Sequence, residues 1–500
     1  MSATINAQAR SDTAESLKNE KSFGIAEGDD DVYSTFSSWQ RNCIVGLAAF
    51  AGWFSSISSF IYFPAIPFLA QDLGAAIQQI NLTVTAYLVM SGIFPSIMGD
   101  AADRFGRRPV LLVGLTVYFC ANLGLAAQSH LGLLFAFRVL QSAGISGTFS
   151  VAYGVLGDLF TPAERGWYSG VLAFFLNTPP SIGPLLSGLL LLRWTWRSIF
   201  WFLSASSAIC LLLMVLLLPE TARNIVGNGI TQARSPFNKP LIPLLSPPSI
   251  SAATTFPSST PQKRHPPNPL ASLLVLTNPS TALLLLVYAI NYSVYSALQA
   301  SLSTLFVSTY HITGLTAGLI YLPFGIACAI STFATGKLLD VDFRRTASSL
   351  GVAIQPGKAT DLRDFPVEKA RVRSVVYTVA LCATLVVAYG WMLEKEVTMA
   401  GVLVVQGSMG LVIQPVFTAL NTLLVDVHPQ APATAQAACN FVRCEMAAGC
   451  LAGLDALLGR VGCGFGFLLF GCAVGLEVVM LSVLQWRGLS WRRARARRGG

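Results

Sequence analysis

A dense cluster of opposite charges stands between two long apolar runs, in the segment Gly99–Pro109. Its charged residues are Asp100, Asp103, Arg104, Arg107 and Arg108. Carboxylates and guanidinium groups at this spacing can form ion pairs. At a water boundary such pairs break and re-form easily, because an exposed pair contributes only about 0 to 1 kcal/mol. The residue types therefore indicate a reversible switch of paired charges rather than bond-making chemistry.

Charged side chains also occur inside apolar runs, at Arg138, Arg443 and Glu445. An arginine at the centre of a bilayer costs about 2.5 to 3.5 kcal/mol, so it should face a protein interior and be paired or hydrated. Positions 443 and 445 point to different sides of a helix, so we expect these two residues to have separate partners. We expect Glu445 to be the most deeply placed carboxylate, with Asp455 and Glu477 nearer the ends of their runs.

Polar aromatic side chains recur at helical spacing in the seventh apolar run, where they fall on one face. Such a stripe suits a wet cavity that stacks or hydrogen-bonds a planar solute. The alternative is a contact face between helices. The residues that we expect to line a cavity are Tyr288, Asn291, Tyr292, Tyr295, Gln414 and Asn440.

These residues must be positioned by membrane-spanning helices. Of the 500 residues, 53% are hydrophobic and only 11% are charged, whereas soluble domains carry roughly 25% charged residues. A membrane-spanning helix needs about 20 apolar residues, and about twelve such runs recur. Their approximate limits are 43–66, 82–98, 109–127, 133–156, 166–191, 198–218, 281–305, 314–335, 374–393, 398–425, 432–454 and 462–484.

A proline-rich stretch divides the runs into two sets of six. Twelve of the 26 prolines lie between Pro219 and Pro279, which predicts a flexible cytosolic linker. We therefore expect a disordered tail (1–42), a six-helix bundle (43–218), the linker (219–280), a second bundle (281–484) and a basic tail (485–500).

The two sets resemble each other at one position. Shifting the charge cluster by 237 residues brings Gly99, Asp103, Arg107 and Arg108 onto four identical residues, which again follow the second run of a six-helix half. This match predicts a duplication, as in many secondary transporters. The matching residues of the second half are Gly336, Asp340, Arg344 and Arg345.

The basic residues predict the orientation. With the N-terminus in the cytosol, 27 of the 33 lysines and arginines fall in cytosolic segments, as the positive-inside rule requires. Both termini are then cytosolic. Membrane lipid accounts for the net charge of +9 and for the basic tail, so we expect no nucleic acid as a partner.

The fifth run carries Gly183, Pro184 and Gly188. Proline removes a backbone hydrogen bond and bends a helix, and glycine lets a neighbouring helix approach closely. A bent, closely packed helix suits an element that rocks. The alternative is packing without motion.

Together these segments resemble the major facilitator superfamily over nearly all of the chain from about residue 40. Gly99–Arg108 is similar to the loop motif between its second and third helices, Arg138 with Gln141 and Gly144 to its fourth-helix motif, and Gly183–Gly188 to its antiporter motif. Further stretches resemble the fungal twelve-span drug:proton antiporters of the quinidine-resistance type, at Ile61–Ala65, Trp196–Trp201, Leu218–Arg223, Phe365–Arg371 and Leu423–Asp426.

The resemblance implies an all-α membrane protein with the major facilitator fold, in which twelve transmembrane helices form two six-helix bundles. It implies export of small amphiphilic, cationic or aromatic compounds (drugs, toxins, secondary metabolites or polyamines), driven by proton entry through alternating access. The charge cluster, including Gly106, would act as a gating latch. Arg138 would take part in proton coupling, for which we add Glu445 as a hypothesis from its depth. Gly183, Pro184 and Gly188 would form the bent antiporter helix.

Two other functions stay open: a proton symporter that imports a nutrient, and a membrane receptor that does not transport. An enzyme is not expected, because no Gly-x-Ser-x-Gly motif or metal-ligand spacing occurs and the four histidines are dispersed. We expect no cofactor or metal beyond the proton gradient. We also expect a monomer in the plasma membrane, or alternatively in the vacuolar membrane.

Overall fold

The computed structural model describes residues 34–160, 168, 172, 175, 179–229, 235–246, 276–312, 314–350, 365–428 and 432–499. Over these residues the secondary structure is helical, without strands, which confirms the all-α prediction. Helices suit long apolar segments in a bilayer because all their backbone hydrogen bonds are internal. The first 33 residues of the predicted tail and residues 247–275 of the predicted linker lie outside the described part of the chain.

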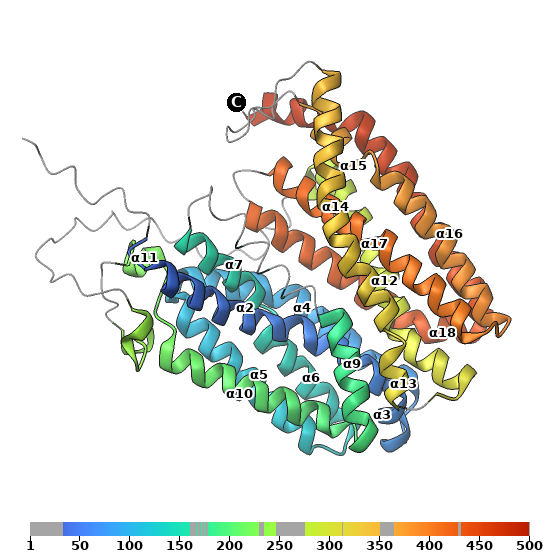
Figure 1. The fold of residues 1–500 in the computed structure, drawn as a ribbon, viewed down its shortest axis with the longest axis horizontal. Helices are drawn as coiled ribbons and strands as arrows, with labels where there is room; N and C mark the ends of the chain where they lie inside the picture. Colours follow the sequence, from blue (N-terminus) through green and yellow to red (C-terminus); the bar gives the residue numbers. More distant parts are fainter. Residues whose placement is uncertain are drawn as a thin grey trace, which may run out of the picture.

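The first half of the chain forms one helical bundle, in blue to green in Figure 1. Its elements are α2 (Ser38–Phe60), η2 (Phe63–Ala65), α3 (Ile66–Asp72), α4 (Ile77–Phe105), α5 (Arg107–Ala127), α6 (Leu131–Ile145), α7 (Thr148–Leu159), α9 (Pro179–Arg193) and α10 (Arg197–Leu217). Three short elements follow: α11 (Arg223–Val226), η3 (Pro236–Asn238) and η4 (Pro243–Leu245).

The second half forms a matching bundle, in yellow to red in Figure 1. Its elements are α12 (Pro279–Tyr310), α13 (Gly314–Leu319), α14 (Leu322–Ser349), α15 (Val367–Val372), α16 (Val375–Glu394), α17 (Met399–Val427) and α18 (Pro432–Gly499). Within α18 the chain turns at Gly462, which has φ 79° and ψ 168°. Ten described helical segments are long and apolar enough to cross a membrane when α2 to α3, α6 to α7 and α13 to α14 are each taken as one segment. With α18 counted twice and α9 added, the described helices account for the twelve predicted spans.

The two bundles meet at one end and diverge toward the other (Figure 1). We call the end where they meet the closed end. There α9 packs on α13, and α3 and η2 lie against α12. We call the opposite end, which carries Gly99–Arg108, α11 and α15, the charged end. The two bundles also touch where α4 packs on α18. There Asn81 Nδ2, near the start of α4, donates to Asp455 Oδ2 at 2.7 Å across the boundary.

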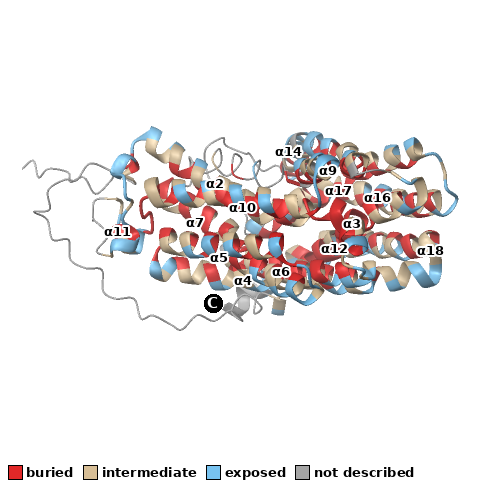
Figure 2. Ribbon diagram, turned by 90° about the horizontal axis from the view of Figure 1, so that it is seen from below, coloured by how far each residue is buried: buried red, intermediate tan, exposed pale blue. Residues whose placement is uncertain are grey.

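Buried residues follow the inward faces of the helices in both bundles, and exposed ones cover the outside (Figure 2). The outward-facing residues include many large apolar side chains, among them Val113, Ile209, Leu212 and Val404. Such exposure suits contact with lipid rather than water.

The charge cluster differs from the predicted loop. Gly99–Phe105 continues α4 as helix, and the chain turns only at Gly106, which has φ 110°. The Asp100–Arg104 ion pair at i,i+4 spacing stabilises this helical end, and the Asp103–Arg107 pair crosses the turn to the start of α5. A side chain at Gly106 would be strained by the positive φ and would collide with Glu220.

The beginning of the predicted linker is docked on the first bundle. Backbone amides of Leu241 and Ile242 donate to the carbonyls of Val215 and Leu216 at 3.3 and 2.8 Å. At its other edge, Gln40 Nε2 donates to Ser246 O at 2.9 Å. Within residues 219–246, the described part is therefore folded against the charged end.

Candidate functional site

The charge cluster forms ion pairs within the first bundle. Arg104 pairs with Asp100 at 3.0 Å. Arg107 pairs with Asp103 at 2.6 Å and with Asp158, at the end of α7, at 3.0 Å. Asp103 is 66% exposed, whereas the Arg107 and Asp158 side chains are 13% and 10% exposed. Asp158, which we did not predict as a site residue, is therefore the less hydrated partner of Arg107.

Arg108 makes hydrogen bonds to backbone carbonyls, and its gating role stays a prediction. Its guanidinium donates to backbone carbonyls of Val215 and Leu218 at 2.8 and 2.7 Å, and to that of Phe237. The carboxylate of Glu220 accepts from the first two amides of α5 at 2.8 and 3.3 Å, which satisfies groups that have no partner within the helix. Arg108 and Glu220 thus fasten the start of the linker to α5.

The second bundle carries an equivalent pair. Arg371 of α15 lies 2.9 Å from Asp426, at the end of α17, with both side chains mostly buried. Close by, burial raises the pKa of the Glu368 carboxyl, while Arg492, 3.3 Å away, opposes that rise. The Arg371–Asp426 pair joins α15, just before the ninth span, to the end of the tenth, as Arg107–Asp158 joins the start of the third span to the end of the fourth. Its residues differ from those that the shift by 237 positions selects.

Those predicted residues of the second half lie along the last turns of α14. A Cβ atom at Gly336 would have no neighbour within 4 Å. Arg344 and Arg345 are exposed. The described residues provide neither arginine with an ion-pair partner within 4 Å. The Asp340 side chain lies outside the described residues. A latch role for these four residues stays a prediction.

Arg138 lies at the centre of the first bundle and is 0% exposed. Its guanidinium carbon lies 4.1 Å from the ring centroid of Tyr62 and 4.4 Å from that of Tyr87. Its Nη1 donates to Gln141 Oε1 at 2.6 Å and to Ser58 O at 3.4 Å. The faces of two aromatic rings and two neutral acceptors stabilise this buried cation.

Arg443 holds a similar position in the second bundle. It stacks 4.9 Å from the centroid of Tyr292, and its Nε and Nη2 donate to Asn440 Oδ1 at 3.1 and 2.8 Å. Asn440 in turn donates from Nδ2 to Ser91 O of α4 at 2.8 Å. Arg443, Tyr292 and Asn440 are therefore joined directly to the helix that carries Tyr87.

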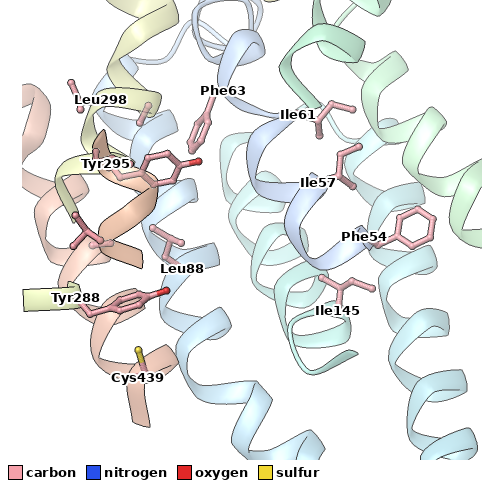
Figure 3. Packing of buried hydrophobic residues seen from close by; sticks show 14 of the residues in the cluster. Phe54, Ile57, Ile61, Phe63, Leu88, Ile145, Tyr288, Tyr295, Leu298 and Cys439 are labelled. Atoms are coloured by element: carbon pink, nitrogen blue, oxygen red, sulfur yellow. The ribbon is translucent and has the colours of Figure 1, made fainter. Parts of the chain in front are cut away.

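The predicted tyrosines line this boundary. Tyr288 and Tyr295 project from α12 toward the helices that carry Leu88 and Phe63 (Figure 3). Tyr288, Tyr292 and Tyr295 surround the ring of Phe417, with centroids 5.2, 6.3 and 5.9 Å away. Gln414, one turn before Phe417, is half-buried. The structure thus brings the three tyrosines together with the arginine and the amides.

Asn291 does not share the site of the tyrosines. It is 0% exposed, and its Nδ2 donates to Glu477 Oε2 at 2.7 Å within the second bundle. Glu477 is also 0% exposed. Glu477 is therefore more buried within the protein than Glu445, which is only half-buried. The depth of Glu445 along its membrane span stays a prediction.

Glu445 lies at the boundary between the bundles. A Cβ atom at Gly92 of α4 would meet Glu445 Oε1 at 2.7 Å. That oxygen is buried and has no hydrogen-bond partner. A movement of α4 away from α18 would expose the Glu445 carboxylate to water, and the reverse movement would bury it again.

The antiporter-motif residues lie in α9 at the closed end. Pro184 is inside the helix, and Gly183 packs on the end of α2. A Cβ at Gly188 would meet Gly318 Cα at 2.8 Å and Leu315 O at 3.0 Å. The absence of a side chain at Gly188 lets α9 and α13 touch backbone to backbone.

An exposed recess at the closed end is separate from these groups. It is lined by Phe68, Asp72, Trp194 and Trp196, among others. Asp72 is already bonded there, to Trp196 Nε1 at 2.9 Å and Arg197 Nη1 at 3.1 Å. Aromatic side chains at this level are typical of a membrane interface, so the buried arginines make the better candidate site.

Two six-helix bundles that meet at an interface with buried charges are compatible with several transporter families. One sequence comparison settles which family this is. The family model of the Major Facilitator Superfamily covers residues 48–453. The chain belongs to the major facilitator superfamily. A solved structure agrees on the fold: the human organic anion transporter MFSD10 superimposes with a TM-score of 0.54 at 17% identity, covering 88% of this chain and 99% of that one.

Curated relatives of this superfamily member are named as transporters. The MFS-type transporter phiD of a fungal species is 36% identical, covering 93% of this chain and 71% of the relative. The multidrug transporter QDR2 of Candida glabrata is 33% identical over 84% and 76%, and quinidine resistance protein 1 of Saccharomyces cerevisiae is 30% identical over 93% and 86%. These matches confirm the predicted family and the prediction of a transporter rather than an enzyme.

Proposed function

We propose that this transporter is a proton-coupled antiporter that exports small amphiphilic compounds. The observation that carries the proposal is the boundary between the bundles, where Arg443, Asn440 and the tyrosines of α12 face the helix that carries Tyr87. Polar and aromatic groups together suit a solute with one planar apolar part and one polar part. The names of relatives as multidrug and quinidine-resistance transporters support export.

Alternating access supplies the mechanism. With the charged end in the cytosol, the arrangement of the bundles corresponds to an inward-facing state that receives substrate from inside the cell. The contact between α9 and α13 and the bond from Asn81 to Asp455 hold the closed end shut. Export requires these contacts to separate while the charged ends of the bundles come together.

Proton coupling in this proposal uses Glu445 and Arg138. A protonated Glu445 is neutral and can stay against Gly92, whereas its charged form favours hydration. Arg138, fixed between two rings, supplies a constant positive charge on the other side of the boundary. Entry and release of one proton would thereby shift the balance between the two states, since each state hydrates Glu445 differently.

Accumulation in cells tests the direction of transport. Cells that overexpress the chain and deletion cells receive fluorescent amphiphiles with anionic, neutral or cationic groups. Export predicts lower accumulation of at least one dye on overexpression and loss of this effect when the proton gradient is dissipated. Higher accumulation would favour the proton symporter. Unchanged accumulation of every dye, despite binding to the purified protein, would favour a receptor.

We place the protein in the plasma membrane with both termini in the cytosol, acting as a monomer. The concentration of basic residues in the proposed cytosolic segments supports this orientation.

A further inference from the structure

Two intramembrane arginines, Arg138 at the centre of the first bundle and Arg443 at the boundary between the bundles, have only neutral hydrogen-bond partners. Arg138 binds Gln141 Oε1 and Ser58 O, and Arg443 binds Asn440 Oδ1. Within the described part of the chain, no carboxylate lies within 4 Å of either guanidinium. An intramembrane arginine is normally paired or hydrated. Two of them without an acid, one from each bundle, create a positively charged region.

One edge of Arg138 is left without hydrogen bonds. Its Nε and Nη2 atoms are buried and have no hydrogen-bond partner. The N–H bonds of these two atoms point in the same direction, along the edge of the guanidinium that binds the two oxygens of a carboxylate in parallel. The stacked rings of Tyr62 and Tyr87 hold the guanidinium plane, so this edge keeps a fixed direction.

The acids of the protein itself are placed elsewhere. Glu445 Oε1 lies against Gly92, and Glu477 is bonded to Asn291 within the second bundle. Neither neutralises Arg138 or Arg443. The positive charge of the half-buried Arg443 is therefore available to a solute that enters the boundary, and the fully buried Arg138 acts on such a solute only at a distance.

Arg443 is the more accessible of the two cations. Its side chain is half-buried, and it stands beside the half-buried rings of Tyr292 and Phe417. A solute that places an anionic group on Arg443 can lay an apolar, planar part against these rings. Arg138 lies deeper, behind Tyr87.

We propose that the transported substrates are amphiphilic organic anions, bound through a carboxylate by Arg443 and drawn inward by the charge of Arg138. This inference rests on the proposed export function and names its substrate class. A cationic amphiphile would face two uncompensated positive charges at low dielectric, where repulsion is strong. The tyrosine rings contribute to the binding of the apolar part in either case.

Binding of three probes with one ring system tests the charge preference. 2-Naphthoate, 2-naphthamide and 2-naphthylmethylammonium are titrated by calorimetry into the purified full-length chain in lipid nanodiscs at pH 7.4. We expect the carboxylate to bind at least tenfold more tightly than the ammonium. Arg443→Gln should reduce that preference, leaving the smaller contribution of Arg138, and Arg443→Lys should keep more of it. Arg460→Gln, which changes an exposed arginine of α18, is the matched control and should bind as the original chain does.

Equal or tighter binding of the ammonium overturns the proposal, as does an unchanged preference in a folded Arg443→Gln variant. Efflux from vesicles under a pH gradient, measured with the same probes, separates this inference from the proposed function. Carboxylate binding without proton-driven flux would contradict the antiporter and leave the anion site standing. Proton-driven flux of the ammonium alone would contradict the anion site and leave the antiporter standing.

Discussion

The ion pair between Arg107 and Asp158 should contribute more to stability than the pair between Arg107 and Asp103. Both pairs have short distances, 3.0 and 2.6 Å. They differ in hydration, since Asp158 is 10% exposed and Asp103 is 66% exposed. Asp158→Asn removes the charge from the shielded partner and leaves Arg107, itself 13% exposed, with the exposed one.

The expected magnitudes follow from this difference. A hydrogen bond to a charged group contributes about 1.5 to 3 kcal/mol, and breaking a fully buried pair costs about 3 to 5 kcal/mol. For a pair that is mostly shielded, we expect Asp158→Asn to cost about 2 to 3 kcal/mol. Asp103→Asn should cost less than about 1 kcal/mol, as exposed pairs do.

Thermal unfolding of the purified chain in detergent checks this order. Arg107→Gln and the double variant Arg107→Gln/Asp158→Asn complete a double-mutant cycle, which isolates the energy of the pair. The coupling energy between Arg107 and Asp158 should exceed that between Arg107 and Asp103. A larger loss of stability from Asp103→Asn, or a coupling energy near zero for Asp158, would refute the reasoning.

Three further predictions concern transport. Asp103→Asn should slow efflux while changing the substrate Kd less than twofold. Loss of substrate binding with a normal rate of conformational cycling would contradict a latch role. Gly188→Ala should separate α9 from α13, because the added Cβ has no space there. Labelling of a cysteine introduced at the closed end should then rise, and efflux should fall at least tenfold. Gly453→Ala, whose Cβ meets open space, should show none of these effects. Glu445→Gln should abolish the pH dependence of substrate binding. Glu477→Gln should preserve it, because that acid lies away from the boundary, and the reverse outcome would transfer the coupling role to Glu477.

Much of the fold could be predicted because apolar length alone defines a membrane span. The ends of the helices could not. Gly99–Phe105 carries so many charges that it resembles a loop, yet Asp100 and Arg104 stand at i,i+4 spacing and support another two turns of helix. Likewise, the proline content of the linker gives no sign that its first part binds Arg108 through the backbone carbonyl of Phe237.

Site residues were predictable where their polarity differed from that of the apolar run around them. Arg138 and Arg443 stand out as cations in apolar runs, and Tyr292 by its helical spacing. Asp158 was missed because its partner Arg107 is 51 positions away in the sequence, and the bond between Glu477 and Asn291, 186 positions apart, was no more predictable. A weak signal existed for Asp158, since the fourth and tenth spans both end in an aspartate shortly before a proline.

Simultaneous recording of solute and proton flux in vesicles reconstituted with the purified chain tests the central claim most directly. A pH-sensitive dye reports proton movement while a labelled amphiphilic carboxylate is released or taken up. Antiport predicts that an imposed solute gradient alone drives protons in the opposite direction, and that Glu445→Gln stops this movement while solute exchange continues. Proton movement in the same direction as the solute, or solute flux without any proton movement, would contradict it.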